Sequence, residues 1–224
     1  MLVGDEQFVR SGMTRIAPPS PPSTDTTAPS AVRPRRFTQE EYFRMIDSGV
    51  LGPTDRTELI NGYLVEMTAQ NAPHRAAVGK VDQQFQKRLD ERAYWVQTQA
   101  TLPLDCRNVP EPDIAILEGA PDDLLNQEPD EVPLVIEVSD TTLAYDRTER
   151  CACYASNDVP AYWIINLQNH TLECYRRPAA DEYRERRTLD RTDTVRLPFN
   201  DTLSIDVGAL LPSPSEAGKD TGGD

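Results

Sequence analysis

Two short apolar runs near the middle of the chain each carry one carboxylate, and this pattern constrains the fold more than any other feature. The first run covers residues 112–117 and contains Asp113; the second covers 134–138 and contains Glu137. Their length and composition are typical of buried strands. Burying an ionised acid in such a strand is costly unless a positive group compensates it. If the two strands are neighbours, the two acids can share one compensating cation.

The residues before these runs predict helices and a hairpin. Thr38 and Glu41 form a capping-box pattern at the start of a helix over 38–48. Asn61-Gly62 between two strand-like segments predicts a β-hairpin, because both residues tolerate positive φ. Apolar residues recurring every fourth position predict a longer helix over 73–92.

The second half of the chain predicts a mixed sheet. We expect strands near 94–104, 113–118, 133–138 and 162–165, a helix over 146–157, and a C-terminal β-hairpin extension after residue 171. A single crossover helix between 138 and 162 makes the strands on either side of it parallel. The predicted fold class is therefore α/β, with a mixed β-sheet flanked by helices.

Composition divides the chain into three parts. Residues 1–36 are rich in Pro, Ser and Thr and predict a disordered arm. Residues 37–211 are long enough for one domain with its own core. Residues 212–224 again resemble a disordered tail. We find no apolar run of the ~20 residues that a membrane helix needs and no signal-peptide pattern at the N-terminus, so we expect a cytoplasmic protein that does not contact membranes.

The charge of the chain restricts its partners. The formal net charge is −14 at pH 7, and the charges of the arm and the tail cancel, so the predicted domain carries all of it. Non-specific nucleic-acid binding usually draws on a basic surface. This composition therefore counts against a strong non-specific DNA binder, although positive residues and a metal ion gathered in one cleft can still act on nucleic acid.

A third acid extends the candidate site. Glu58 opens the first strand of the predicted hairpin, and three carboxylates suit a hard cation such as Mg²⁺. Such a cation polarises a phosphate and lowers the pKa of a bound water. Many magnesium-dependent phosphodiesterases also carry a lysine two residues after the second acid, but here that position is Ser139.

Several motifs together resemble one known family. They are Glu-Leu-Ile-Asn-Gly at 58–62, Pro-Glu-Pro-Asp-Ile-Ala-Ile at 110–116, Leu-Val-Ile-Glu-Val-Ser-Asp at 134–140, Tyr-Asp-Arg-Thr-Glu-Arg at 145–150 and Val-Pro-Ala-Tyr-Trp-Ile-Ile at 159–165. In this order they resemble the Uma-type restriction endonuclease family of the PD-(D/E)XK nuclease superfamily. The resemblance covers about residues 37–211.

The resemblance implies a restriction-endonuclease-like core and DNA hydrolysis with Mg²⁺, or alternatively Mn²⁺. It carries over Glu58, Asp113 and Glu137 as catalytic acids and metal ligands, and His74 as a position where the family often keeps a histidine. The superfamily lysine is implied to have moved to the following helix, where this chain has Arg150. Arginine keeps the positive charge but cannot give up a proton. A homodimer would supply two sites for cutting both strands.

Two other interpretations stay open. The chain can be a nuclease-fold protein that lost activity and acts as a binding module, or Asp113 and Glu137 can be structural acids paired with Arg147 or Arg150. Carboxylates within ~4–5 Å of each other in an open cleft beside Arg150 would favour a metal site. Carboxylates sealed against arginines would favour the structural interpretation.

Overall fold

The computed structural model describes residues 34–52, 54–125, 129 and 131–213. The chain divides after Pro34, and the account below concerns the part that begins at Arg35. Nearly all of the predicted arm at 1–36 and tail at 212–224 lies outside the described residues. No helix in the described ranges is both long and apolar enough to cross a membrane.

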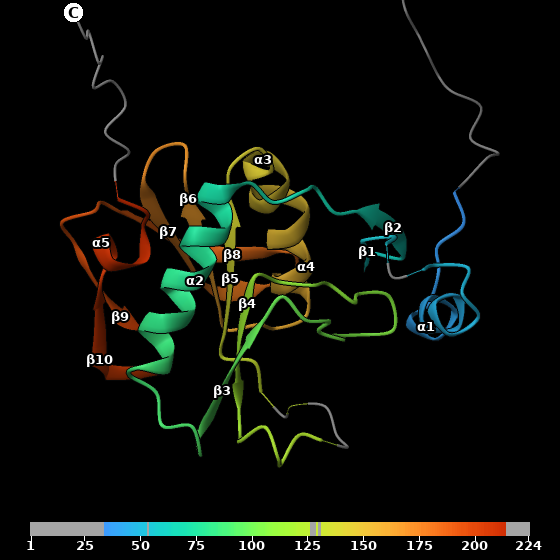
Figure 1. Cartoon of the computed structure of the whole chain (residues 1–224), viewed down its shortest axis with the longest axis horizontal. Helices are drawn as coiled ribbons and strands as arrows, with labels where there is room; N and C mark the ends of the chain where they lie inside the picture. The colour runs from blue at the N-terminus through green and yellow to red at the C-terminus, as the bar shows by residue number, and fades with distance from the viewer. Residues whose placement is uncertain (1–33, 53, 126–128, 130, 214–224) are drawn as a thin grey trace, which may run out of the picture. The chain divides into compact units, whose positions relative to one another are not determined.

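A six-stranded mixed sheet forms the centre of the domain, with strand order β3-β4-β5-β6-β7-β8 (Figure 1). Only β5 and β6 are parallel, as the single crossover between them predicts. The other neighbouring pairs are antiparallel. The strands are β3 (Tyr94–Thr98), β4 (Ile114–Glu118), β5 (Leu134–Ser139), β6 (Ala161–Asn166), β7 (Thr171–Ala179) and β8 (Glu182–Leu189).

Helices cover both faces of this sheet. On one face lie α2 (Ala72–Gln86) and α5 (Val207–Leu210). There the buried ring of Phe85 packs against that of Trp163, with ring centroids 6.1 Å apart. On the other face, α3 (Leu143–Tyr145), the π-helical turn η1 (Asp146–Arg150) and α4 (Cys151–Ser156) follow one another. Tyr154 and Tyr162 pack there with ring centroids 5.0 Å apart. The predicted α/β class with a mixed, helix-flanked sheet is confirmed.

The N-terminal elements bring one acid to the sheet. The capping box of α1 (Gln39–Asp47) forms as predicted, and β1 (Thr57–Ile60) and β2 (Tyr63–Glu66) make the Asn61-Gly62 hairpin with positive φ at both turn residues. Leu59 exchanges two backbone hydrogen bonds with Val109. This pairing holds Glu58 beside the segment that leads into β4.

Two element boundaries and one strand pairing differ from the prediction. α2 ends at Gln86 rather than 92: the Arg88 N–H bonds to the Phe85 carbonyl three residues back, and Asp90 then accepts N–H groups of a separate turn. β3 ends at Thr98 rather than 104, because Gln99 turns to positive φ. The predicted C-terminal hairpin, β7–β8, continues the main sheet, while β9 (Thr194–Leu197) and β10 (Asn200–Asp206) form a separate hairpin.

Candidate active site

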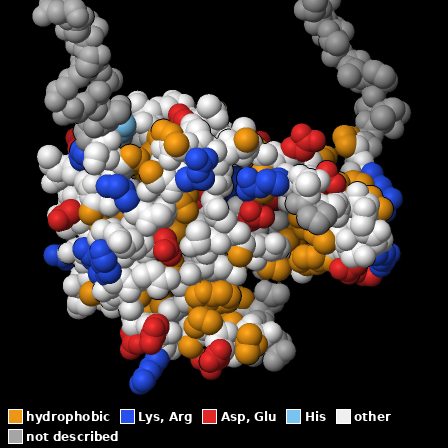
Figure 2. All heavy atoms as spheres, viewed as in Figure 1, with side chains coloured by type: hydrophobic (Ala, Val, Ile, Leu, Met, Phe, Trp, Pro, Cys, Tyr) orange, Lys and Arg blue, Asp and Glu red, His pale blue; other side chains and the backbone are white. Residues whose placement is uncertain are grey.

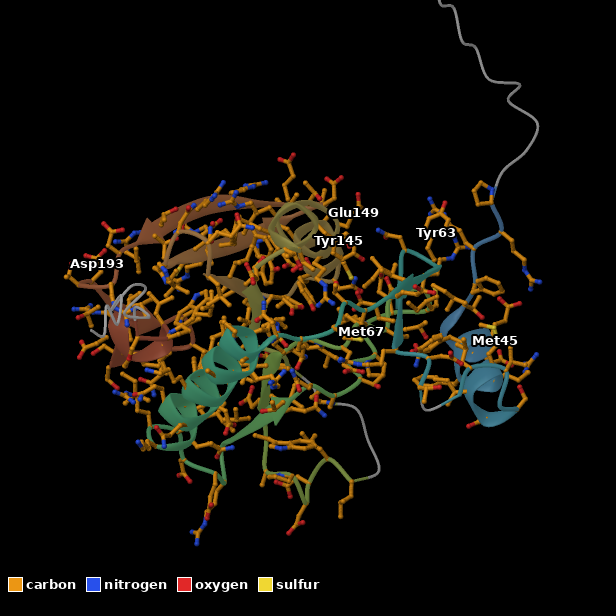
Figure 3. All side chains as sticks on the ribbon, turned by 45° about the horizontal axis from the view of Figure 1, so that its top comes forward. Met45, Tyr63, Met67, Tyr145, Glu149 and Asp193 are labelled. Carbon is orange, nitrogen blue, oxygen red and sulfur yellow. The ribbon has the colours of Figure 1, made fainter. Side chains whose placement is uncertain are left out.

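A cavity of about 360 Å³ lies where β1, β5, η1 and the start of α2 meet. Met67, on the segment after β2, and Tyr145, at the end of α3, both line it (Figure 3). Its walls carry an unusual number of acids: Glu58, Glu66, Glu111, Asp113, Glu137, Asp140 and Asp146. Four of these, Glu58, Asp113, Glu137 and Asp146, are buried.

Asp113 and Glu137 lie opposite each other on two neighbouring antiparallel strands. The register pairs Ile114 with Ile136, so Asp113, one residue before β4, lies opposite Glu137. Each carboxylate accepts a backbone N–H from the other strand: Asp113 Oδ2 accepts from Val138 at 2.9 Å, and Glu137 Oε2 accepts from Asp113 at 3.3 Å. The backbone of the sheet therefore fixes both acids side by side, as their positions in the sequence predict.

Arg150 joins three of the four buried acids. One terminal nitrogen of its guanidinium donates to both oxygens of Glu58, at 2.9 and 3.0 Å, and the other donates to Glu137. Its Nε lies 3.5 Å from Asp146. The planar fork of arginine allows these contacts at once, which a lysine ammonium on its flexible stem does not match. Arg150 is therefore the positive group of the site, at the position predicted for it.

Asp146 is the acid that the sequence prediction missed. It accepts hydrogen bonds from the hydroxyls of Ser139 and Thr142, both at 2.7 Å, and it lies one π-helical turn before Arg150. The i,i+4 spacing of Asp146 and Arg150 is a signal that could have revealed it. Ser139, where a lysine was expected, instead holds Asp146 in place beside Arg150.

His74 occupies the first turn of α2 and contacts the fourth acid. Its Nε2 lies 3.1 Å from Asp113 Oδ2, and Gln99 donates to the other oxygen of Asp113 at the same distance. The Nδ1 atom of His74 is buried and has no hydrogen-bond partner within the described part of the chain. The five predicted site residues therefore do come together, with His74 oriented by Asp113 rather than by Arg150.

Comparison with known proteins shows which family the chain belongs to. A family model described as "Putative restriction endonuclease", Uma2, matches residues 39–208. The chain belongs to the Uma2 family. A crystal structure of a putative nuclease belonging to DUF820, from Anabaena variabilis, is 17% identical and has a TM-score of 0.58; the match covers 78% of this chain and 97% of that one. At this identity the likeness shows a shared fold. Among curated proteins, none matches the chain.

The buried acids of this Uma2 site lie in a poorly solvated environment, which disfavours their ionised form. Burial raises the pKa of Glu137 to about 8, against the opposing effect of Arg150 and with a further contribution from Asp113. Burial likewise raises the pKa values of Glu58 and Asp146, although Arg150 opposes the rise at both. One arginine therefore does not compensate four buried carboxyl groups, and the site favours an additional proton or cation.

The residues present fit a hard divalent ion in their chemistry. All candidate ligands are carboxylate oxygens, which Mg²⁺ and Mn²⁺ prefer, and the excess of buried acid over buried base favours a cation. Nevertheless, no three His, Cys, Asp or Glu side chains in the described ranges are already arranged as a metal-binding group. Arg150 contacts Glu58 and Glu137 at the place where such a group would form. The site thus combines features of the metal-site and ion-pair interpretations.

A fifth buried acid, Glu173, fixes the other arginine of η1. Its side chain is 1% exposed and accepts hydrogen bonds from Arg147, Arg186, Asn166 and Tyr175. The interpretation that paired Arg147 with Asp113 or Glu137 is wrong, because Arg147 extends from η1 to β7. Burial alone would raise the pKa of Glu173, but the hydrogen bonds from Arg147, Asn166 and Tyr175 outweigh it and lower the pKa to about 2.

We predict that the Glu173 carboxylate makes the free energy of unfolding fall more steeply as the pH is lowered. A folded-state pKa of about 2 against about 4.5 for the unfolded chain stabilises the fold above pH 4.5, and this contribution disappears as the pH falls from 4.5 to 2. It is worth roughly 2–3 kcal/mol. Urea unfolding of wild type and Glu173→Gln at several pH values measures it. The difference in unfolding free energy should shrink toward pH 2, and a constant difference would contradict the assignment.

Proposed function

We propose that this Uma2 chain is a metal-dependent endonuclease that hydrolyses DNA phosphodiester bonds at the acidic cavity. The observation that carries the proposal is the set of four buried carboxyl groups around one buried arginine, placed in a cavity of a nuclease-family fold. Structural ion pairs alone would need fewer acids, since each unpaired buried charge is strongly destabilising.

Within this proposal, Asp113 and Glu137 would hold Mg²⁺ or Mn²⁺, with Glu58 as the third acid. The bound ion supplies charge neutralisation at the phosphate and a water of lowered pKa. Arg150 donates hydrogen bonds to phosphate oxygens and stabilises their developing charge, but it does not move a proton. His74 Nε2 lies 3.1 Å from Asp113, so His74 would orient this proposed ligand and, once Nε2 is released, accept a proton.

A plasmid-nicking assay tests the proposal. Purified wild type should nick supercoiled DNA with Mg²⁺ or Mn²⁺ and lose this activity in EDTA. Asp113→Ala and Glu137→Ala should each lower the rate by at least about a hundredfold, because each removes a ligand and part of the site charge. Equal products from all three proteins would identify contamination, and no product from any of them would contradict the proposal.

A second candidate is a binding module that kept the fold without catalysis. It is favoured by the contacts of Arg150 with Glu58 and Glu137, and by the net charge of −14. On the face drawn in Figure 2, basic side chains are scattered among acidic ones rather than gathered into one surface. This candidate predicts no nicking with any divalent ion.

The setting of the proposed reaction follows from the substrate. Cytoplasmic DNA would be the target, and a homodimer would let two sites cut both strands. Sedimentation with and without a short DNA duplex would test the dimer. The mass of protein bound to the duplex should be twice the mass of one chain.

A further inference from the structure

The arrangement of Arg150 raises a question that the proposed reaction leaves open. Arg150 is buried, and its guanidinium uses both terminal nitrogens on Glu58 and Glu137. Tyr154 donates to the same oxygen of Glu137, at 2.7 Å. With these contacts in place, that oxygen of Glu137 and both oxygens of Glu58 are engaged. An ion that used these atoms as ligands would have to replace the guanidinium.

The fourth acid is held differently. Asp113 has no contact with Arg150; its partners are the Val138 N–H, Gln99 and His74. Of the four buried acids of the cavity, three are therefore bound by Arg150 and Asp113 is not. A divalent ion brought to Asp113 would lie next to Glu137 and repel the guanidinium, since like charges at close range in a poorly solvated site repel strongly.

We propose that Arg150 is an internal counter-ion that binds Glu58 and Glu137 in the metal-free site, and that a divalent ion held by Asp113 and Glu137 loads by displacing the guanidinium from Glu137. The inference rests on the proposed metal site and adds how that site is filled. Before loading, Arg150 limits repulsion among the buried acids. After loading, the ion takes over this role and the guanidinium turns into the cavity, where a phosphate can accept its hydrogen bonds. One side chain therefore serves the metal-free site and the loaded site in turn.

Nuclear magnetic resonance of the wild-type chain tests the displacement directly. The Nε–H signal of Arg150, assigned by its disappearance in Arg150→Lys, should shift or broaden as Mg²⁺ is added, together with the backbone N–H signals of Asp113 and Val138. The Nε–H signal of Arg147, three residues earlier and bound to Glu173, should stay unchanged. This control separates displacement from a general effect of the ion. The experiment needs no activity, and the only variant it uses, Arg150→Lys, serves for the assignment.

Metal affinity provides the second test. Arg150→Gln should bind Mn²⁺ at least about tenfold more tightly than wild type in calorimetry, because the competing cation is gone. It should also gain more thermal stability from Mn²⁺ than wild type does. Arg147→Gln is the matched control: it removes the same charge from the same turn but does not contact the site acids, so its Mn²⁺ affinity should stay within about threefold of wild type.

The outcomes distinguish the inference from the proposed function. Metal binding seen at Asp113 and Val138, with the Arg150 signal unmoved and the Arg150→Gln affinity unchanged, would overturn the counter-ion role and leave the metal site standing. No binding of Mg²⁺ or Mn²⁺ by any of the proteins would overturn both. A shift of the Arg150 signal on Mg²⁺ addition, with tighter Mn²⁺ binding by Arg150→Gln but not by Arg147→Gln, would support both the inference and the metal site.

Discussion

Arg150→Gln is expected to lower plasmid nicking by about 100- to 1000-fold at saturating Mn²⁺, whereas Arg150→Lys keeps activity within about tenfold of wild type. The reason is that catalysis requires a positive charge facing the phosphate, and lysine supplies it. Lysine cannot reproduce the simultaneous contacts with Glu58, Glu137 and Asp146. The lysine variant should therefore be active but less stable without metal.

The measurement is the single-turnover nicking rate, with circular dichroism confirming that each variant is folded. Arg147→Gln serves as the control for loss of a nearby arginine and should retain most of the activity, since its guanidinium binds Glu173. Complete loss in Arg150→Lys would mean that the bidentate geometry of arginine, rather than its charge, is what this position supplies.

Glu137→Gln is expected to separate stability from activity. The pKa of Glu137 is raised to about 8 from about 4.5, so the folded state holds a proton that the unfolded chain has lost. The metal-free protein should therefore lose stability as the pH rises from 4.5 to 8, by a few kcal/mol. Glutamine keeps the Oε1 acceptor for Tyr154 and Arg150 and carries no charge, but its amide nitrogen replaces the Oε2 atom that accepts the Asp113 N–H at 3.3 Å. In EDTA at pH 8.5 we expect the removal of the charge to dominate, so the variant should be at least as stable as wild type. In a separate assay with Mn²⁺, the variant should no longer nick DNA.

Glu173→Gln is the matched control for this result. Both glutamates are buried, but the pKa of Glu173 is lowered to about 2 and that of Glu137 is raised to about 8. At pH 8.5 the Glu173 variant should be less stable than wild type, in the opposite direction from Glu137→Gln. Urea unfolding in EDTA measures both. Clear destabilisation by Glu137→Gln would show that its carboxylate is a net stabilising ion-pair partner of Arg150.

The sequence predicted the elements that place the site, because the signals were local. The Asn61-Gly62 turn, the apolar runs around Asp113 and Glu137, and the single crossover before β6 follow from turn chemistry and strand composition. The exact ends of α2 and β3 did not follow, because a side chain, Asp90, and a positive φ, at Gln99, decided them.

The contacts of the site were harder to predict than its members. Glu58, His74, Asp113, Glu137 and Arg150 were named as candidates, but among their contacts only the pairing of Glu137 with Arg150 was one of the alternatives considered. Arg147 and Arg150 lie three residues apart, and only the π-helical turn decides that one reaches β7 and the other reaches the cavity. Asp146 was missed because its role depends on Ser139, which in the sequence appeared only as a missing lysine.

The most direct test of the metal site is a crystal of the wild-type chain soaked in Mn²⁺, with anomalous scattering used to locate the ion. We predict one strong peak in direct coordination with carboxylate oxygens of Asp113 and Glu137, and the Arg150 guanidinium moved away from Glu137. A crystal that binds Mn²⁺ elsewhere, or shows no peak at these acids while Arg150 still joins Glu58 and Glu137, would contradict the proposed site.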